Sequence, residues 1–378
     1  MTTKSFLQNT ALFVLSCLIS LSGIEVALRI WGDDVVTLGN QYVFYRFDPV
    51  LGWDNLPGMQ GQFSRSEFSY PIKINSSGFW DAELAPKQTD EFRVAVLGDS
   101  FTWGLGVPYG ERFTEVVEVK NSKINMLNLG VSGFSPIQYL LQIDKTLTLK
   151  PDYILVAFCL GNDVADNVSP SPYDHPKPYV RLSSDGNSFD IKGYPLIETK
   201  QNGPYLTGAA SYLRTAGLIK MVIDLLNKRE QSGGDEMSDE LLYVPVEKLS
   251  PEDKSRVAEA FKVNELILAA MKKKIDGALG PGRFAVLLAP TKLEMGQYLL
   301  PGSNPNAVAE GVLASLQRLD IPAIDGRQVI AKEDFWVTDG HWRPSGHKKI
   351  GEMLVPFLSN AQATLGSVSG ARLGISKE

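Results

Sequence analysis

The stretch RVAVLGDS, residues 93–100, decides the fold of this chain. Its aliphatic run ends at Gly98, and a continuous run of this kind is typical of a parallel strand that helices cover on both faces. Further runs of the same kind predict four more buried strands, of which the last is the weakest. They lie at residues 124–129, 153–158, 284–288 and 321–324.

Longer segments with a helical spacing of apolar residues alternate with these runs. They lie at residues 111–120, 136–148, 251–278, 303–318 and 344–358. The alternation of strand and helix predicts an α/β fold, namely a doubly wound, flavodoxin-like parallel sheet in three layers. In such a sheet, binding and catalytic sites form at the carboxyl ends of the strands.

The composition of the 378-residue chain is that of a globular protein. Hydrophobic residues make up 44% and charged residues 21%, with a formal net charge of −6, which excludes a disordered or fibrous chain. Because Lys and Arg are not clustered in a stripe, no nucleic acid partner is expected. The two cysteines, Cys17 and Cys159, predict no disulfide framework.

Residues 6–30 form an apolar segment whose first charge is Glu25. As a helix with a rise of ~1.5 Å per residue it can cross ~30 Å of hydrocarbon, so we expect one N-terminal transmembrane helix. A cleaved signal peptide and a lipoprotein anchored at Cys17 are the alternatives. Lys4 precedes the segment and two aspartates follow it, which favours a cytoplasmic N-terminus and an extracytoplasmic domain, periplasmic or on the cell surface.

The rest of the chain divides into several predicted parts. Residues 32–91, rich in aromatic residues and turn-forming pairs, are expected to form strands and loops packed on a main domain over 92–362. Residues 164–246 interrupt the alternation, start with a Pro-rich loop and include a predicted helix. We interpret them as an insertion beside the site, where long loops select substrates. The helix is predicted at 209–228, and a disordered tail at 363–378.

Gly98, Asp99 and Ser100 directly follow the first predicted strand. A serine at a strand-to-helix junction presents its hydroxyl at the edge of the sheet, and its own backbone N–H can stabilise an oxyanion. The plainer interpretation is that Asp99 or Ser100 only caps a helix. The tripeptide alone leaves both interpretations open.

Two further motifs follow the next two strands. Gly133 ends the segment NLGVSG, residues 128–133, after the second strand, and Gly161, Asn162 and Asp163 follow the third. A glycine N–H and an asparagine amide are suitable donors to a developing oxyanion. Each motif alone is more often a turn, but their order, each after a strand, favours a common site.

The last motif, DGHW, contains His341 and precedes the final predicted helix. A serine hydroxyl needs a base within hydrogen-bond reach, and an aspartate on the other ring nitrogen orients that base. Asp339 is the nearest candidate for the orienting role, with Asp334 as the alternative. Of the two other histidines, His347 is expected to pack or to face solvent. His175 is expected to lie on the surface, with a substrate contact as the alternative.

These motifs together resemble the GDSL/SGNH hydrolase superfamily, named after its Ser, Gly, Asn and His, and in particular its membrane-anchored bacterial esterases. The resemblance covers roughly residues 92–360. It also includes the stretch NSSGF at 75–79, which is common just upstream of the serine motif in membrane-anchored members. It implies a catalytic triad of Ser100 as nucleophile, His341 as base and Asp339 as acid. It also implies an oxyanion hole formed by the backbone N–H of Ser100 with Gly133 and Asn162. The supporting residues of the motifs are Gly98, Asp99, Gly161 and Asp163.

One feature departs from that pattern. Many members place the acid three residues before the histidine, and here that residue is Thr338. The shorter spacing of Asp339 and His341, followed by Trp342, resembles the periplasmic polysaccharide O-acetyltransferases related to alginate acetylation. The run PTK at 290–292 points the same way.

The resemblance therefore implies a serine esterase or acyl hydrolase that acts on an ester in the cell envelope, either an O-acetylated glycan or a lipid. A polysaccharide O-acetyltransferase with the same triad is the alternative. A second alternative is a non-catalytic envelope protein that keeps the fold for binding or assembly. No metal or cofactor is expected, because the aspartates and histidines lack the spacing of metal ligands.

Overall fold

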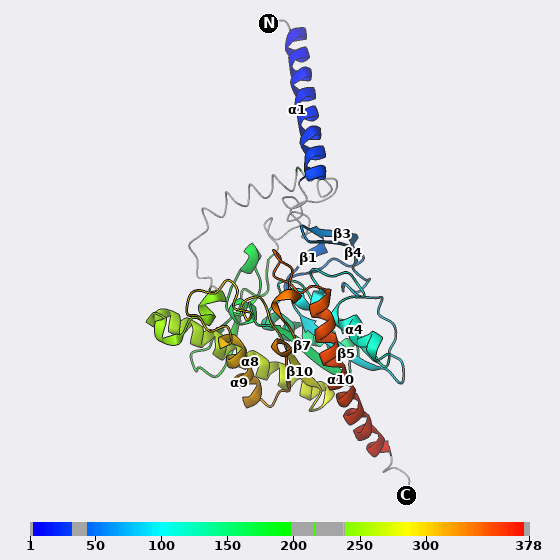
Figure 1. Cartoon of the computed structure of the whole chain (residues 1–378), viewed down its shortest axis with the longest axis vertical. Coiled ribbons are helices and arrows are strands. Elements are labelled where there is room, and N and C mark those ends of the chain that lie inside the picture. Colours follow the sequence, from blue (N-terminus) through cyan, green and yellow to red (C-terminus); the bar gives the residue numbers. More distant parts are fainter. Residues whose placement is uncertain (1–2, 32–43, 198–214, 216–236, 238, 374–378) are drawn as a thin grey trace.

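The computed structural model describes residues 3–31, 44–197, 215, 237 and 239–373. At its centre lies a sheet of five parallel strands in the order β11-β10-β7-β5-β6 (Figure 1). The strands are β5 (Phe92–Gly98), β6 (Ile124–Asn128), β7 (Tyr153–Cys159), β10 (Phe284–Ala289) and β11 (Ala323–Asp325). This is the strand order of the flavodoxin-like doubly wound sheet, so the predicted fold class is confirmed.

Helices cover both faces of this sheet and complete the three layers (Figure 1). One face carries α4 (Phe113–Lys120) and α10 (Pro344–Leu373), and the other carries α5 (Pro136–Thr148), α8 (Pro251–Leu279) and α9 (Ala307–Arg318). Within β5, Val94 and Val96 pack on the α4 side, whereas Ala95 and Leu97 pack on the α5 side. Successive side chains of a strand point to opposite faces, so a fully apolar strand serves both layers.

Two antiparallel hairpins precede the sheet, where the sequence predicted strands and loops. They are β1 (Tyr45–Asp48) with β2 (Gly52–Asn55), and β3 (Gln60–Arg65) with β4 (Phe68–Lys73). Phe63 and Tyr70 of the second hairpin are buried, and the ring of Phe63 lies 5.6 Å from that of Trp103. These aromatic contacts hold the hairpin on the main domain.

The predicted insertion contains a short hairpin that the sequence did not predict, formed by β8 (Tyr179–Leu182) and β9 (Phe189–Lys192). Strands of four residues give too short an alternation to identify from sequence. Single 3₁₀ turns lie at Pro172–Asp174, Asp239–Tyr243 and Val246–Lys248. The helix predicted at 209–228 lies outside the described residues, apart from Thr215.

The final helix is longer than predicted. A disordered tail was expected over 363–378, and this is wrong as far as Leu373, because α10 continues to that residue. Ala361 and Leu365 pack against the apolar cluster that contains Leu358. Apolar residues at intervals of three to four residues thus extend the buried face of the helix past the end of the domain.

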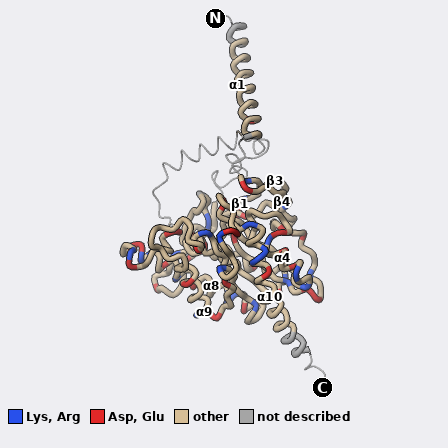
Figure 2. Tube along the Cα trace, in the orientation of Figure 1, with Lys and Arg blue, Asp and Glu red and all other residues tan. Residues whose placement is uncertain are grey.

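The helix α1 (Thr3–Trp31) extends away from the sheet domain (Figure 1). Its segment Gln8–Leu28 has a mean hydropathy of 2.2 and is long and apolar enough to cross a membrane, a property that signal sequences share. Figure 2 shows charges of both signs interspersed over the domain, in contrast to α1. The predicted N-terminal apolar helix is present, and its topology stays a prediction.

Gly98 gives a test of how tightly the end of β5 is packed. A Cβ at this position would overlap the Oγ1 atom of Thr102 and lie 3.0 Å from the carbonyl oxygen of Ala157. We expect Gly98→Ala to lower the free energy of unfolding by roughly 1–3 kcal/mol, because overpacking displaces the neighbours. Gly277→Ala in α8 is the control, since no atom lies within 4 Å of its added Cβ. Urea unfolding followed by tryptophan fluorescence measures both, and equal effects would contradict this packing role.

Candidate active site

Ser100 lies at the junction between β5 and the single-turn helix α3 (Ser100–Trp103), at the carboxyl edge of the sheet. Asp99 is the N-cap of this helix, and its Oδ1 atom accepts a hydrogen bond from the backbone N–H of Phe101 at 2.9 Å. The capping interpretation therefore applies to Asp99. Ser100 instead lines a cavity, so its hydroxyl is placed to meet a bound molecule.

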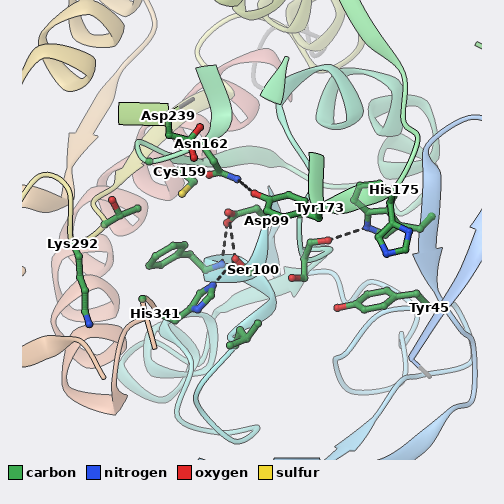
Figure 3. Close-up of a pocket in the computed structure, with 18 of the residues that line it drawn as sticks. Tyr45, Asp99, Ser100, Cys159, Asn162, Tyr173, His175, Asp239, Lys292 and His341 are labelled. Carbon is green, nitrogen blue, oxygen red and sulfur yellow. Dashed lines mark hydrogen bonds between the residues drawn. The ribbon is translucent and has the colours of Figure 1, made fainter. Parts of the chain in front are cut away.

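His341 and Asp339 reach Ser100 from the loop ahead of α10, although Ser100 and His341 lie 241 positions apart in the sequence. The Nε2 atom of His341 lies 2.7 Å from the Oγ atom of Ser100 (Figure 3). Its Nδ1 atom lies 2.6 Å from the Oδ1 atom of Asp339. A base in contact with a serine hydroxyl, held by a carboxylate on its far nitrogen, is the arrangement that activates serine. The structure thus brings the three predicted triad residues together.

The carboxylate of Asp339 is held in its ionised form. Burial raises its pKa, but the hydrogen bond and charge of His341 and the charge of Arg65 outweigh burial and hold the pKa well below its usual range. The Oδ2 atom of Asp339 forms an ion pair with Arg65. Asp334, the alternative acid, pairs with Lys349 at 2.6 Å instead, so the structure favours Asp339.

Gly133 and Asn162, the predicted oxyanion donors, line the same cavity as the nucleophile. Gly133 has a φ of +76°, a region that favours glycine. The Nδ2 atom of Asn162 donates to the hydroxyl of Tyr173 at 2.9 Å and to the Oδ2 atom of Asp166 at 3.1 Å (Figure 3). To accept a hydrogen bond from the Asn162 amide, a substrate oxygen would therefore have to replace the Tyr173 hydroxyl. The oxyanion hole stays a prediction.

Gly161 and Asp163 shape the turn that carries the asparagine. A Cβ on Gly161 would lie 2.7 Å from the side chain of Thr291, so only glycine fits. Asp163 accepts hydrogen bonds from the backbone N–H of Cys159 at 2.9 Å and from the hydroxyl of Tyr139 at 3.1 Å. Burial raises the pKa of Asp163 well above its usual value. The contacts of Asp163 with Cys159 and Tyr139 hold the turn that carries Asn162.

The two remaining histidines have different surroundings. His347 is buried in α10, where its Nδ1 atom accepts a hydrogen bond from the backbone N–H of Phe113 at 3.3 Å, and burial lowers its pKa to about 3. The expectation that it packs is confirmed. His175, expected on the surface, instead lines the cavity, with its ring 6.0 Å from that of Trp53. The Pro-rich loop that carries it packs on β2, which its place in the sequence could not indicate.

The cavity has a volume of about 440 Å³, within the range of sites for small molecules. Besides the residues at the edge of the sheet, segments from distant parts of the sequence contribute to its wall (Figure 3). Tyr45 and Trp53 come from the first hairpin, Tyr173 from the insertion, and Lys292 and Tyr298 from the segment after β10. The four aromatic residues were not predicted as site residues. For Tyr45 and Trp53 the signal was the aromatic content of 32–91, which predicted packing alone, and for Tyr173 it was the predicted position of the insertion beside the site.

Two ionisable side chains in the wall, those of Lys292 and Asp239, have different surroundings. The Nζ atom of Lys292 donates to the carbonyl oxygen of Val337 at 2.8 Å. Burial, together with the charge of Asp166, raises the pKa of Asp239 to about 8, so this side chain is mainly neutral at pH 7. Among the described residues, no group of three His, Cys, Asp or Glu side chains is placed to hold a metal ion.

Asp339→Asn tests which carboxylate orients the histidine. We expect kcat for ester hydrolysis to fall on the order of 10³–10⁴-fold, because an amide does not hold the imidazole in the required tautomer. The matched variant Asp334→Asn should keep kcat near the wild-type value and lower the Tm, since it breaks the contact with Lys349. Kinetics with a chromogenic acetate ester and thermal unfolding measure the two effects. The reverse pattern would assign the orienting role to Asp334.

Asn162→Ala tests the predicted oxyanion donor. Loss of one such donor costs on the order of 10²–10³ in kcat, and KM should change little. Tyr173→Phe is the control, since it removes the hydroxyl that meets the amide and leaves the amide itself in place. Steady-state kinetics of both variants decide the matter. An equal loss in both would show that the hydrogen bond between these residues is required, and would contradict an oxyanion role for Asn162.

No protein-family model and no curated protein matches the sequence. Among solved structures, the chain is similar to a member of the lipolytic protein G-D-S-L family from Veillonella parvula DSM 2008, with 12% identity over 71% of this chain and 98% of that chain and a TM-score of 0.34. It is also similar to a psychrotrophic esterase from Pseudoalteromonas sp. (13% identity, 71% and 98% covered, TM-score 0.36).

The aryl esterase of M. smegmatis gives a comparable result, with 13% identity over 71% of this chain and 99% of that chain and a TM-score of 0.37. With likeness this low, the geometry of Ser100, His341 and Asp339 carries the functional proposal. The solved structures similar to this chain include lipolytic proteins of the G-D-S-L family and esterases.

Proposed function

We propose that this chain is a serine esterase of the SGNH type. The observation that carries the proposal is the hydrogen-bond chain from Asp339 through His341 to Ser100, with contacts of 2.6 Å and 2.7 Å. It lies in the wall of a cavity of about 440 Å³. A nucleophile in contact with its base, a base in contact with its orienting acid, and an adjacent cavity meet the geometric requirements of acyl transfer.

The proposed reaction has two steps through an acyl-enzyme. The Oγ atom of Ser100 attacks the ester carbonyl carbon while its proton passes to Nε2 of His341. The tetrahedral intermediate places its oxyanion near the Ser100 N–H, the Gly133 N–H and the Asn162 amide, and its collapse releases the alcohol with the proton from His341. Water then attacks the acyl-enzyme and gives a proton to His341. The second tetrahedral intermediate collapses, the bond to the Oγ atom of Ser100 breaks, His341 returns the proton to that oxygen, and the carboxylic acid leaves. Throughout, Asp339 holds the Nδ1–H of the imidazole.

The cavity supports a short acyl group on a compact alcohol. Its volume is at the lower end of small-molecule sites, and its wall carries the rings of Tyr45, Trp53 and Tyr173. Aromatic faces suit the flat, apolar faces of sugar rings as well as acyl or aryl groups. We place the substrate in the cell envelope, as an O-acetylated glycan or a lipid ester. The support for this is α1, with Lys4 before its apolar segment and Asp33 and Asp34 after it.

A polysaccharide O-acetyltransferase is the second candidate, and one observation favours it. Asp339 and His341 are separated by a single residue, and Trp342 follows, buried with its indole N–H donating to the carbonyl oxygen of Pro290 at 3.0 Å. This joins the acid–base motif to the PTK run at 290–292. The acyl-enzyme would be the same, and a sugar hydroxyl in place of water would accept the acyl group.

Ser100→Ala tests the proposed nucleophile. A fluorophosphonate probe should label the wild-type protein and leave this variant unlabelled, and ester turnover should fall on the order of 10⁶-fold. Ser132→Ala is the matched control, since Ser132 lines the same cavity and has no part in the triad, so labelling should persist. Wild-type protein that does not react would favour a non-catalytic role in binding or assembly.

A partition experiment separates the two catalytic candidates. The full-length protein in detergent is given a chromogenic acetate ester, with and without an oligosaccharide acceptor, and the products are identified by mass spectrometry. We expect free acetate in both cases, because the proposed esterase uses water as the acyl acceptor. Acetylated oligosaccharide as the main product would contradict the esterase and favour the O-acetyltransferase.

A further inference from the structure

The turn of the β3–β4 hairpin contacts the loop that carries two of the triad residues. By this turn we mean Arg65, the last residue of β3, together with the two turn residues Ser66 and Glu67. We name residues 337–341 the acid–base loop. The contacts join positions 270 to 274 residues apart in the sequence. The hairpin belongs to the segment that follows α1, outside the five-stranded domain.

Glu67 binds the backbone of the acid–base loop. Its carboxylate accepts hydrogen bonds from the N–H groups of Val337 at 2.7 Å, Thr338 at 2.8 Å and Asp339 at 2.8 Å. It also accepts one from the hydroxyl of Thr338 at 2.6 Å. Burial raises the pKa of Glu67, but these hydrogen bonds outweigh burial and lower the pKa below its usual value. Three successive N–H groups on one carboxylate fix the peptide planes just before His341.

Arg65 acts on the side chain of the acid itself. Its guanidinium pairs with the Oδ2 atom of Asp339, while the Oδ1 atom accepts from His341. The two carboxylate oxygens are thus divided between a cation and the imidazole. Arg65 is only 23% exposed, and Asp339 5%, so the pair is partly shielded from water and its charges interact more strongly than on an open surface. This contact fixes the rotation of the carboxylate that holds the imidazole.

The hairpin is itself held rigidly against the site. The ring of Phe68 lies 5.3 Å from that of Trp336, which immediately precedes the acid–base loop. The backbone N–H of Trp336 donates to the carbonyl oxygen of His341 at 3.1 Å, and its indole N–H donates to the carbonyl oxygen of Gly106 at 3.2 Å. These contacts of Phe68 and Trp336 hold the hairpin turn in place against the acid–base loop.

We propose that Arg65 and Glu67 are positioning residues of the active site, supplied by the segment between the N-terminal helix and the main domain. Glu67 sets the backbone of the acid–base loop, and Arg65 sets the orientation and charge of Asp339. The inference rests on the proposed function, because it assigns these residues to the triad. It makes the hairpin a required part of the esterase.

Arg65→Met removes the cation and keeps an apolar side chain of similar length. We expect the rate of fluorophosphonate labelling and kcat/KM to fall roughly 10–100-fold, because small displacements of reacting groups are costly. Without the cation, protonation of the imidazole is favoured, so the acid limb of the kcat/KM profile should move to higher pH by roughly one unit or less. Arg65→Lys keeps the charge and should leave that limb in place. A role in folding alone would not move it.

Glu67→Gln tests the contact with the loop backbone. An amide presents one acceptor oxygen in place of two charged ones, so kcat should fall roughly 10-fold or more with KM nearly unchanged, since Glu67 does not line the cavity. Glu67→Asp should restore part of the rate. Glu83→Gln is the matched control, because Glu83 also accepts a backbone N–H, that of Ser76 at 3.1 Å, away from the cavity. Its kcat should equal the wild-type value.

The two proposals fail in different ways. Wild-type protein that does not react with the fluorophosphonate overturns the proposed esterase. Wild-type protein that reacts, together with Arg65→Met and Glu67→Gln variants that react equally fast with an unshifted acid limb, overturns the positioning role and leaves the esterase standing. Thermal unfolding of each variant is measured in parallel. Where Arg65→Met does not fold, Arg65→Gln takes its place.

Discussion

The hydrogen bond between the imidazole of His341 and the hydroxyl of Ser100 joins the two ends of the main domain. Ser100 follows the first strand of the sheet, β5, and His341 precedes the last helix, α10. A contact of 2.7 Å between them requires β5 and α10 to keep one relative position. That position is set by the packing of Leu354 and Leu358 of α10 on the same apolar cluster as Val94 and Val96. The site therefore depends on the core, because close-packed interiors transmit displacements.

The carboxylates around the nucleophile differ in charge because their surroundings differ. Burial raises the pKa of Asp99 and Asp163, and both accept hydrogen bonds from backbone N–H groups, which suits a structural role. Asp339 is also buried, but the hydrogen bond with His341 and the charge of Arg65 outweigh burial and lower its pKa. A carboxylate that stays ionised is the kind that can stabilise an imidazolium. The same residue type thus serves as helix cap, as turn support and, in the proposed triad, as the acid.

Parts of the chain outside the sheet domain complete the cavity. The first hairpin provides Tyr45 and Trp53, and the insertion provides Tyr173 and His175. In the proposed esterase, the sheet edge supplies the reacting groups, and the flanking segments supply the walls that would contact a substrate. This division is common in doubly wound folds, where differences in the loops change which substrate binds and the sheet holds the catalytic side chains in position. The second hairpin contacts the acid–base loop directly through Arg65 and Glu67.

The sequence by itself determined the strands of the central sheet and identified the candidate reacting groups. Apolar periodicity is local, so the run at 93–97 predicted β5, and the order of the motifs after successive strands predicted that Ser100, Asn162 and His341 would meet at one edge. Only the tertiary structure decided that Arg65 and Glu67 join them, that His175 lines the cavity, and that α10 continues to Leu373. Such contacts depend on how the separate segments pack. No local pattern encodes the distance between side chains more than two hundred residues apart.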